Sequence, residues 1–159
     1  MTSLNESHGT ALRSWVASAN ATGADFPIQN LPFGVFRRAG SEEVFRIGVA
    51  IGDDILDLTA AHDLGSFTGA ARAAAQACCA PTLNAFMGMG SAAWSSLRLA
   101  LSRALREGSA LESALRPCLA SQANAEFAVP ARIGAHSSAA AYVGVGFTRG
   151  HCRFQERMP

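Results

Sequence analysis

A chain of 159 residues, of which 49% are hydrophobic and 16% charged, has enough apolar material to form a packed core and too little charge for a disordered, solvated chain. The net charge of +1 argues against a strongly basic surface, so we expect no nucleic-acid partner. All 13 basic residues are arginine, and without lysine the chain lacks the ammonium group needed for Schiff-base chemistry or for the lysine-dependent nucleotide loop.

We interpret residues 1–24 as a polar lead-in with one short amphipathic piece, Ala11 to Ala19, long enough for a helical turn or two. The first ten residues contain Asn5 and Glu6 where a secretory signal needs a basic start and an apolar centre. The chain also has no run of 18 apolar residues. We therefore expect a soluble, cytoplasmic protein with no membrane partner.

Apolar residues between Phe26 and Leu58 alternate as they do in half-buried strands. Every second position is apolar in one predicted strand, through Phe45, Ile47, Val49 and Ile51. The Gly52-Asp53 pair accepts turn geometry, and the apolar run resumes from Ile55 to Leu58. This pattern predicts a β-hairpin.

A third strand is predicted from Phe33 to Arg37, joined to the hairpin by the polar segment 38–43. Pro27 and Pro32 confine the preceding segment to a sheet edge or to irregular structure. Three short antiparallel strands so close in sequence favour a small curled sheet or barrel.

Residues 59–120 have the composition of helices. The alanine-rich stretch from Ala70 to Ala77 predicts one helix, and Pro81 forces a new start. A second helix is indicated by one apolar face at helical spacing, made of Trp94, Leu97, Leu101 and Leu105. We interpret this face as core, and we expect Gly108 to end the helix as its C-cap.

Ser109 and Glu112 have the spacing of a capping box, which predicts a further short helix closed by Pro117. One more strand returning to the sheet is suggested by Phe127, Val129, Pro130 and Ile133. Together with the hairpin these elements predict an α+β fold.

Three carboxylates near the hairpin, Asp53, Asp54 and Asp57, could in principle serve acid/base or metal chemistry. Their position in a tight turn favours turn formation and solvation instead. The four cysteines are irregularly spaced and lack a CxxC pair: Cys78, Cys79, Cys118 and Cys152. We interpret them as reduced thiols.

Several segments resemble, in order, motifs of the fumarylacetoacetase family. They are DFPIQNLPFGVF (25–36) with RIGVAIGDDILDL (46–58), PTLNAFMGMG (81–90) with AAW (92–94), and VPARIG (129–134). The resemblance covers about residues 25–134 and implies the family's N-terminal domain, a small SH3-like antiparallel barrel with attached helices. It further implies a homodimeric, Mg- or Ca-dependent enzyme that hydrolyses 4-fumarylacetoacetate to fumarate and acetoacetate in tyrosine and phenylalanine breakdown.

The resemblance stops after Gly134. Family members continue Asp-Tyr-Thr-Asp-Phe-Tyr and then reach a His, which supply a metal ligand, a substrate contact and the general base. Counting from Gly134 places Ser138, Ala140 and Val145 at these positions. A neutral hydroxyl is a poor ligand for a hard divalent cation, and valine cannot accept a proton. We therefore expect no catalytic, metal or cofactor-binding residue and no bound cofactor in this chain.

Other patterns after residue 134 also have plain structural explanations. Beside His136 the nearest carboxylate within ten residues is Glu126, and Gly144 to Gly150 resembles a phosphate loop with its third glycine one residue late. The His151-Cys152 pair lacks the second pair of a zinc site. A solvated helix face accounts for the remaining basic residues, Arg149, Arg153 and Arg157.

These patterns predict four parts: the lead-in 1–24, the family-like domain 25–120, the segment 121–134 that leads toward a catalytic domain, and a divergent, irregular, loosely attached tail 135–159. Three hypotheses stay open. The chain is an inactive truncated product with an unrelated tail, a stand-alone module that docks on a catalytic domain or full-length homologue, or a small hydrolase with a rebuilt site.

Overall fold

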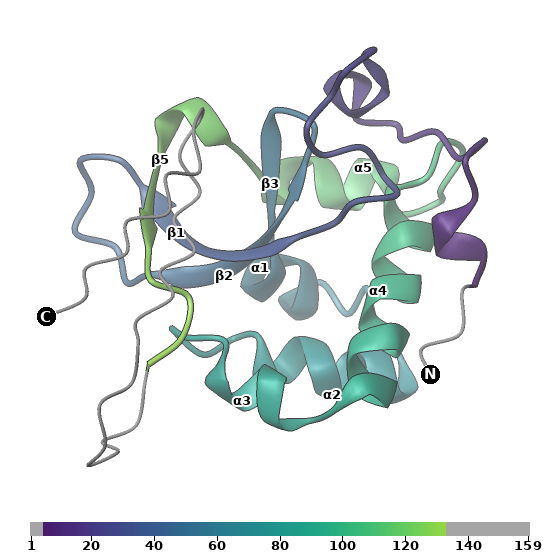
Figure 1. Ribbon diagram of the computed structural model, residues 1–159. Helices are drawn as coiled ribbons and strands as arrows, with labels where there is room; N and C mark the ends of the chain where they lie inside the picture. Colours follow the sequence, from purple (N-terminus) through teal and green to yellow (C-terminus); the bar gives the residue numbers. More distant parts are fainter. Residues whose placement is uncertain (1–4, 133–159) are drawn as a thin grey trace, which may run out of the picture.

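A five-stranded antiparallel sheet forms the centre of the protein in the computed structural model, which describes residues 5–132 (Figure 1). The strands lie in the order β4-β3-β2-β1-β5. Their bounds are β1 Phe33–Arg38, β2 Arg46–Ile51, β3 Asp54–Asp57, β4 Leu119–Ser121 and β5 Ala125–Ala128. The three strands predicted between residues 33 and 58 are therefore confirmed within one residue at each end.

The sheet curls strongly without closing. β4 and β5 lie at opposite edges, yet only the 3-10 helix Gln122–Asn124 separates them along the chain. The outer strands of a flat five-stranded sheet would lie about 19 Å apart, whereas four Cα steps reach at most about 14 Å. The edges must therefore approach each other, but β4 and β5 do not pair in the part of the chain that the structure describes. The predicted curled sheet is confirmed, and the closed barrel is not.

The last predicted strand is shifted toward the N-terminus. β5 ends at Ala128, before Val129 and Pro130, and Ile133 lies outside the described residues. Val129 is 79% exposed, and proline lacks the N–H that would continue the ladder. The short edge strand β4 had no sequence signal, because three residues are too few to show an alternation.

Helices α1 to α4 cover one side of the sheet (Figure 1). The helix bounds are α1 Leu58–Asp63, α2 Gly69–Ala77, α3 Asn84–Gly88, α4 Ser91–Leu105 and α5 Glu112–Leu115. The alanine-rich helix is confirmed as α2, and it packs on α4 through small buried side chains. Across residues 5–132, the helices are too short or too polar to span a membrane.

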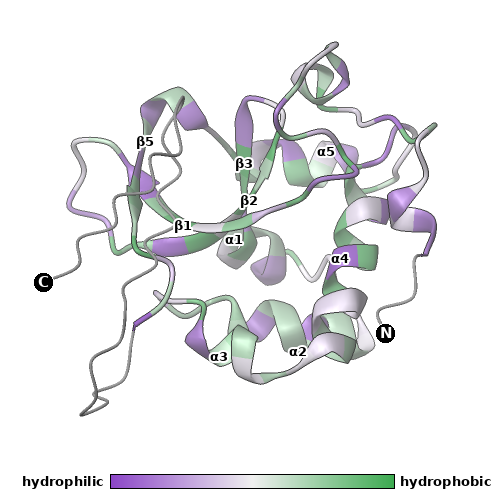
Figure 2. Ribbon diagram, in the orientation of Figure 1, coloured by the Kyte–Doolittle hydropathy of each residue, from purple (hydrophilic) through white to green (hydrophobic). Residues whose placement is uncertain are grey.

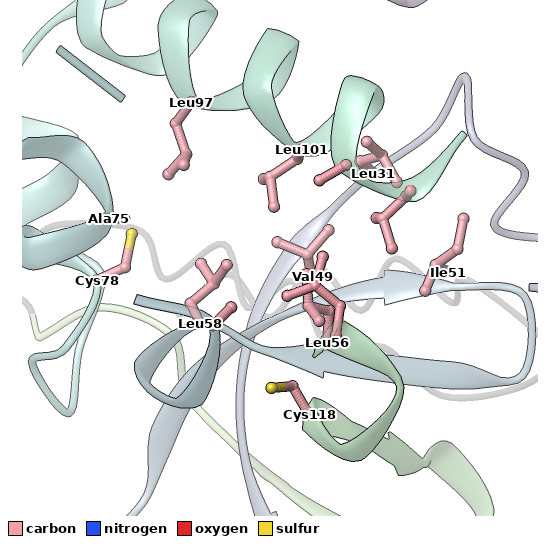
Figure 3. Packing of buried hydrophobic residues seen from close by; sticks show 14 of the residues in the cluster. Leu31, Val49, Ile51, Leu56, Leu58, Ala75, Cys78, Leu97, Leu101 and Cys118 are labelled. Atoms are coloured by element: carbon pink, nitrogen blue, oxygen red, sulfur yellow. The ribbon is translucent and has the colours of Figure 1, made fainter. Parts of the chain in front are cut away.

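The core lies between this helical layer and the sheet. Figure 3 shows Leu97 and Leu101 pointing from α4 toward Val49 and Leu58, and all four side chains are fully buried. In Figure 2 the hydrophobic, green ribbon lies largely in the strands and in α2 to α4, whereas the loop between β1 and β2 has a hydrophilic, purple tip. The leucine positions of the predicted stripe are thus confirmed as core.

Trp94, the fourth member of that stripe, was wrongly expected to be buried. It is 42% exposed, and its indole Nε1 donates a hydrogen bond to the Phe86 carbonyl oxygen at 2.8 Å. This bond joins α4 to α3. Trp94 is in the first turn of α4, before the first buried residue of the helix, so helical spacing alone did not place it against the core.

α4 also ends earlier than expected. The helix stops at Leu105, and Arg106 is extended with φ −72° and ψ 152°. Ser14 Oγ donates to the Leu105 carbonyl oxygen at 2.7 Å, and the Trp15 N–H donates to the same oxygen at 3.3 Å. These partners satisfy a helix-end carbonyl that a glycine cap would otherwise serve. Gly108, the predicted cap, lies three residues beyond the helix.

The predicted capping box is wrong. The Ser109 hydroxyl accepts a hydrogen bond from the Leu111 N–H at 3.2 Å, and α5 begins only at Glu112. A capping glutamate must stand at the third helical position to reach back to the cap. Glu112 stands at the first and pairs with Arg116 one turn later. The helix does end just before Pro117, as expected.

Part of the segment interpreted as a polar lead-in belongs to the core. Trp15, Val16 and Ala19 are 9%, 5% and 3% exposed. The indole Nε1 of Trp15 donates to the Ala104 carbonyl oxygen at 2.9 Å. Within residues 5–24 the helical structure consists of two 3-10 helices, Glu6–His8 and Ala17–Asn20, so most of the predicted amphipathic piece is not helical.

Candidate functional site

The tip of the β2–β3 hairpin is held by two distant segments. Gly52 adopts φ +56°, and a Cβ at this position would collide with the Ser18 hydroxyl. The Gly52 N–H donates to the Phe26 carbonyl oxygen at 2.7 Å, and the Gln122 side chain donates to the Gly52 carbonyl oxygen at 2.8 Å. The predicted turn is confirmed, and glycine is required here for its conformation and for its lack of a side chain.

The three carboxylates near this hairpin have separate roles. Asp53 lies in the turn, and Asp54 begins β3, where burial and then the neighbouring Asp53 raise the pKa of its carboxyl group. The Asp57 carboxylate accepts two backbone N–H groups of the first turn of α1, at 3.0 and 3.2 Å. It also lies 2.9 Å from Nε of Arg46. The turn interpretation therefore fits Asp53, but Asp57 is a helix cap.

The cysteines that the structure describes are free thiols. Cys78 is fully buried, and burial together with the neighbouring Cys79 raises its pKa to about 12. Burial also raises the pKa of the Cys79 and Cys118 thiols. A thiol reacts and binds metals as its thiolate, so these three groups are poorly suited to either role at neutral pH. Within residues 5–132, His, Cys, Asp and Glu side chains form no group of three that could hold a metal ion.

A hollow of about 1140 Å³ lies on the face of the sheet that the helices leave open. Phe36, Gly48 and Ile55 form its floor, and one wall is the loop 18–26. The opposite wall consists of residues 121–123 with Phe127, which is 48% exposed. The floor is apolar, and the lining includes the carboxylates of Asp25 and Asp53 but no His or Cys. The hollow therefore offers shape and apolar contact, with two carboxylates at its edge.

Two of the motif segments meet at α3. The Leu83 N–H donates to the Pro130 carbonyl oxygen at 2.7 Å. The Asn84 side chain donates to the Arg132 carbonyl oxygen and accepts from the Arg132 N–H, both at 2.8 Å. Sequence reasoning did not single out Asn84, because its partner lies 48 residues away and nothing local distinguishes it from a surface asparagine.

Candidates after residue 132 lie outside the described residues. They include the three positions that replace the family's catalytic groups, Ser138, Ala140 and Val145, together with His136, Gly144 to Gly150, the His151-Cys152 pair, and Arg149, Arg153 and Arg157.

Comparison with known proteins identifies the described unit. The family model for the fumarylacetoacetase N-terminal region matches residues 29–130. The chain is 42% identical over 138 residues to the fumarylacetoacetase of Oryza sativa subsp. japonica, a match covering 81% of this chain and 31% of the rice protein. Against the fumarylacetoacetase of Homo sapiens it is 46% identical over 119 residues, covering 72% of this chain and 28% of the human protein.

The chain thus spans less than a third of these relatives. The matched region coincides with the sheet and its helical layer, and it contains most of the motif segments whose contacts are described above. This agreement confirms the resemblance drawn from the sequence. The chain belongs to the fumarylacetoacetase family, and it corresponds to the N-terminal part of the family's proteins.

Proposed function

We propose that this unit is the structural N-terminal part of a fumarylacetoacetase, a protein that as a whole hydrolyses 4-fumarylacetoacetate to fumarate and acetoacetate. One observation carries the proposal. The family match over residues 29–130 coincides with a packed unit in which motif side chains either lie in the core or bind the unit's own backbone.

Four side chains illustrate this use of the motifs. Ile28 and Leu31 of the first motif are 1% and 2% exposed and belong to the core. Asp57 caps α1, and Asn84 binds the backbone at Arg132. Because these side chains are committed to folding, the proposal assigns the family's Mg or Ca ion and its catalytic groups to the remaining part of the whole protein.

A chimeric enzyme tests the proposal. Residues 5–132 of this chain replace the matched segment of the rice fumarylacetoacetase, and hydrolysis is followed by the loss of substrate absorbance with Mg or Ca present. We expect metal-dependent turnover by the chimera and none by the 159-residue chain alone. A second chimera carrying Leu101→Asp, which buries an unpaired charge in the core, should lose activity with its fold.

Two outcomes would refute it. Either the chimera folds cooperatively but has no activity, or the 159-residue chain hydrolyses the substrate at a rate comparable to the chimera. The second result would favour the small hydrolase with a rebuilt site.

Exposed apolar side chains favour a second candidate, an assembly module that binds a full-length fumarylacetoacetase. Met87, Trp94 and Phe127 are 54%, 42% and 48% exposed. Such side chains commonly mark contact surfaces. The match covers 31% of the rice protein and 28% of the human protein, so most of each relative lies outside the matched region. Size-exclusion chromatography with light scattering, on the chain alone and mixed with the rice enzyme, should then show a complex. Separate elution of the two proteins would eliminate this role.

A further inference from the structure

We propose that Asn84 is a clamp that fixes the backbone of residues 130–132 against α3. Its Nδ2 donates to the Arg132 carbonyl oxygen and its Oδ1 accepts from the Arg132 N–H, each at 2.8 Å. A side-chain amide carries both a donor and an acceptor, so it pairs with a peptide group as a neighbouring strand would. The proposal concerns this chain's own conformation and does not depend on its activity.

A third hydrogen bond belongs to the same device. The Leu83 N–H donates to the Pro130 carbonyl oxygen at 2.7 Å, so two adjacent residues bind both ends of the short segment 130–132. Figure 1 shows this yellow-green segment descending from β5 to α3. β5 itself ends at Ala128, and Val129 is 79% exposed. Past β5, the path of the backbone therefore depends on contacts with α3.

α3 provides a fixed platform for the clamp. Phe86, two residues after Asn84, is 5% exposed, and its ring centroid lies 4.9 Å from that of Phe33 in β1. Trp94, in α4, donates a hydrogen bond from its indole Nε1 to the Phe86 carbonyl oxygen at 2.8 Å. α3 is therefore joined to both the sheet and the longest helix. Hydrogen bonds to α3 therefore fix residues 130–132 relative to the sheet and α4.

Backbone hydrogen exchange on the 159-residue chain tests the clamp. In Asn84→Ala, we expect protection of the Arg132 amide to fall roughly tenfold, as loss of one to two hydrogen bonds predicts. Protection of Val49, in the centre of the sheet, should stay unchanged. The matched control is Asn30→Ala, which removes another exposed amide, one that donates to the Asp25 carbonyl oxygen at 3.2 Å. It should leave Arg132 unaffected.

Asn84→Asp distinguishes the clamp from a general loss of stability. An ionised carboxylate can accept the Arg132 N–H but repels the Arg132 carbonyl oxygen, whereas the protonated acid can both donate and accept. Because the Arg132 N–H keeps an acceptor in Asn84→Asp, protection of the Arg132 amide should stay closer to that of the unmodified chain than it does in Asn84→Ala. Equal Arg132 protection in Asn84→Ala and the unmodified chain, or no more protection in Asn84→Asp than in Asn84→Ala, would overturn the proposal.

Discussion

On the helix-covered face of the sheet, Ile47, Val49 and Leu56 are fully buried beneath side chains from α1, α2 and α4, whereas the opposite face carries an open hollow. On that opposite face Phe36 and Ile55 are 1% and 3% exposed, and both side chains lie close to Gly48. The covered face is therefore sensitive to the removal of atoms, and the open face to their addition.

The largest effect should come from removing atoms on the covered face. Leu101→Ala empties a fully buried site between α4 and the sheet, and we expect a loss of about 2 to 5 kcal/mol in the free energy of unfolding. Urea denaturation measures it. Leu99→Ala, at a partly buried position of the same helix, is the control and should cost clearly less. Equal losses would contradict the assignment of α4's core face.

Adding one methyl group on the open face should have the next largest effect. In Gly48→Ala the new Cβ would lie 2.6 Å from Cε1 of Phe36, and we expect a loss of about 1 to 3 kcal/mol. Gly34 lies directly opposite in the register, and a Cβ there meets no atom within 4 Å. Gly34→Ala should therefore be neutral or slightly stabilising. If both variants unfold at the same urea concentration, the proposed close packing over Gly48 is wrong.

Asp57 connects the two faces, because it pairs with Arg46 and caps α1. Asp57→Ala removes both interactions, and we expect it to cost about 1 to 2 kcal/mol. Asparagine retains a capping oxygen but loses the charge. The loss of stability should therefore be smaller in Asp57→Asn than in Asp57→Ala. Added salt should weaken the Asp57–Arg46 pair and so destabilise the unmodified protein but neither variant. Thermal denaturation at two salt concentrations measures both effects.

The smallest effect should come from Asp54. Its folded-state pKa is raised by burial and by Asp53, so the unfolded chain ionises first as the pH rises. Ionisation of Asp54 therefore lowers the free energy of unfolding at a pH above the folded-state pKa. At a pH below the unfolded-state pKa the carboxyl group is neutral in both states, and this loss is absent. Asp54→Asn should raise the melting temperature slightly at pH 7 and have no such effect near pH 3. A stabilisation that persists unchanged at pH 3 would show that charge is not its cause.

Elements with a local pattern were predictable. Alternation placed β1 to β3, alanine content placed α2, and leucine spacing identified the buried face of α4. Features that depend on distant partners were not predictable. The early end of α4 follows from Ser14, and the clamp at Asn84 follows from Arg132, each far away in sequence.

The sequence by itself determined the family, through the resemblance of its ordered motifs. It also determined the α+β class and the order of the main strands and helices, because periodicity and turn residues act between near neighbours in the chain. The tertiary structure decided that the sheet curls without closing, that Trp94 is exposed and that Asp57 caps a helix. These outcomes depend on which distant groups bury a side chain or supply its hydrogen-bond partner. The spacing of residues along the chain does not show which distant groups these are.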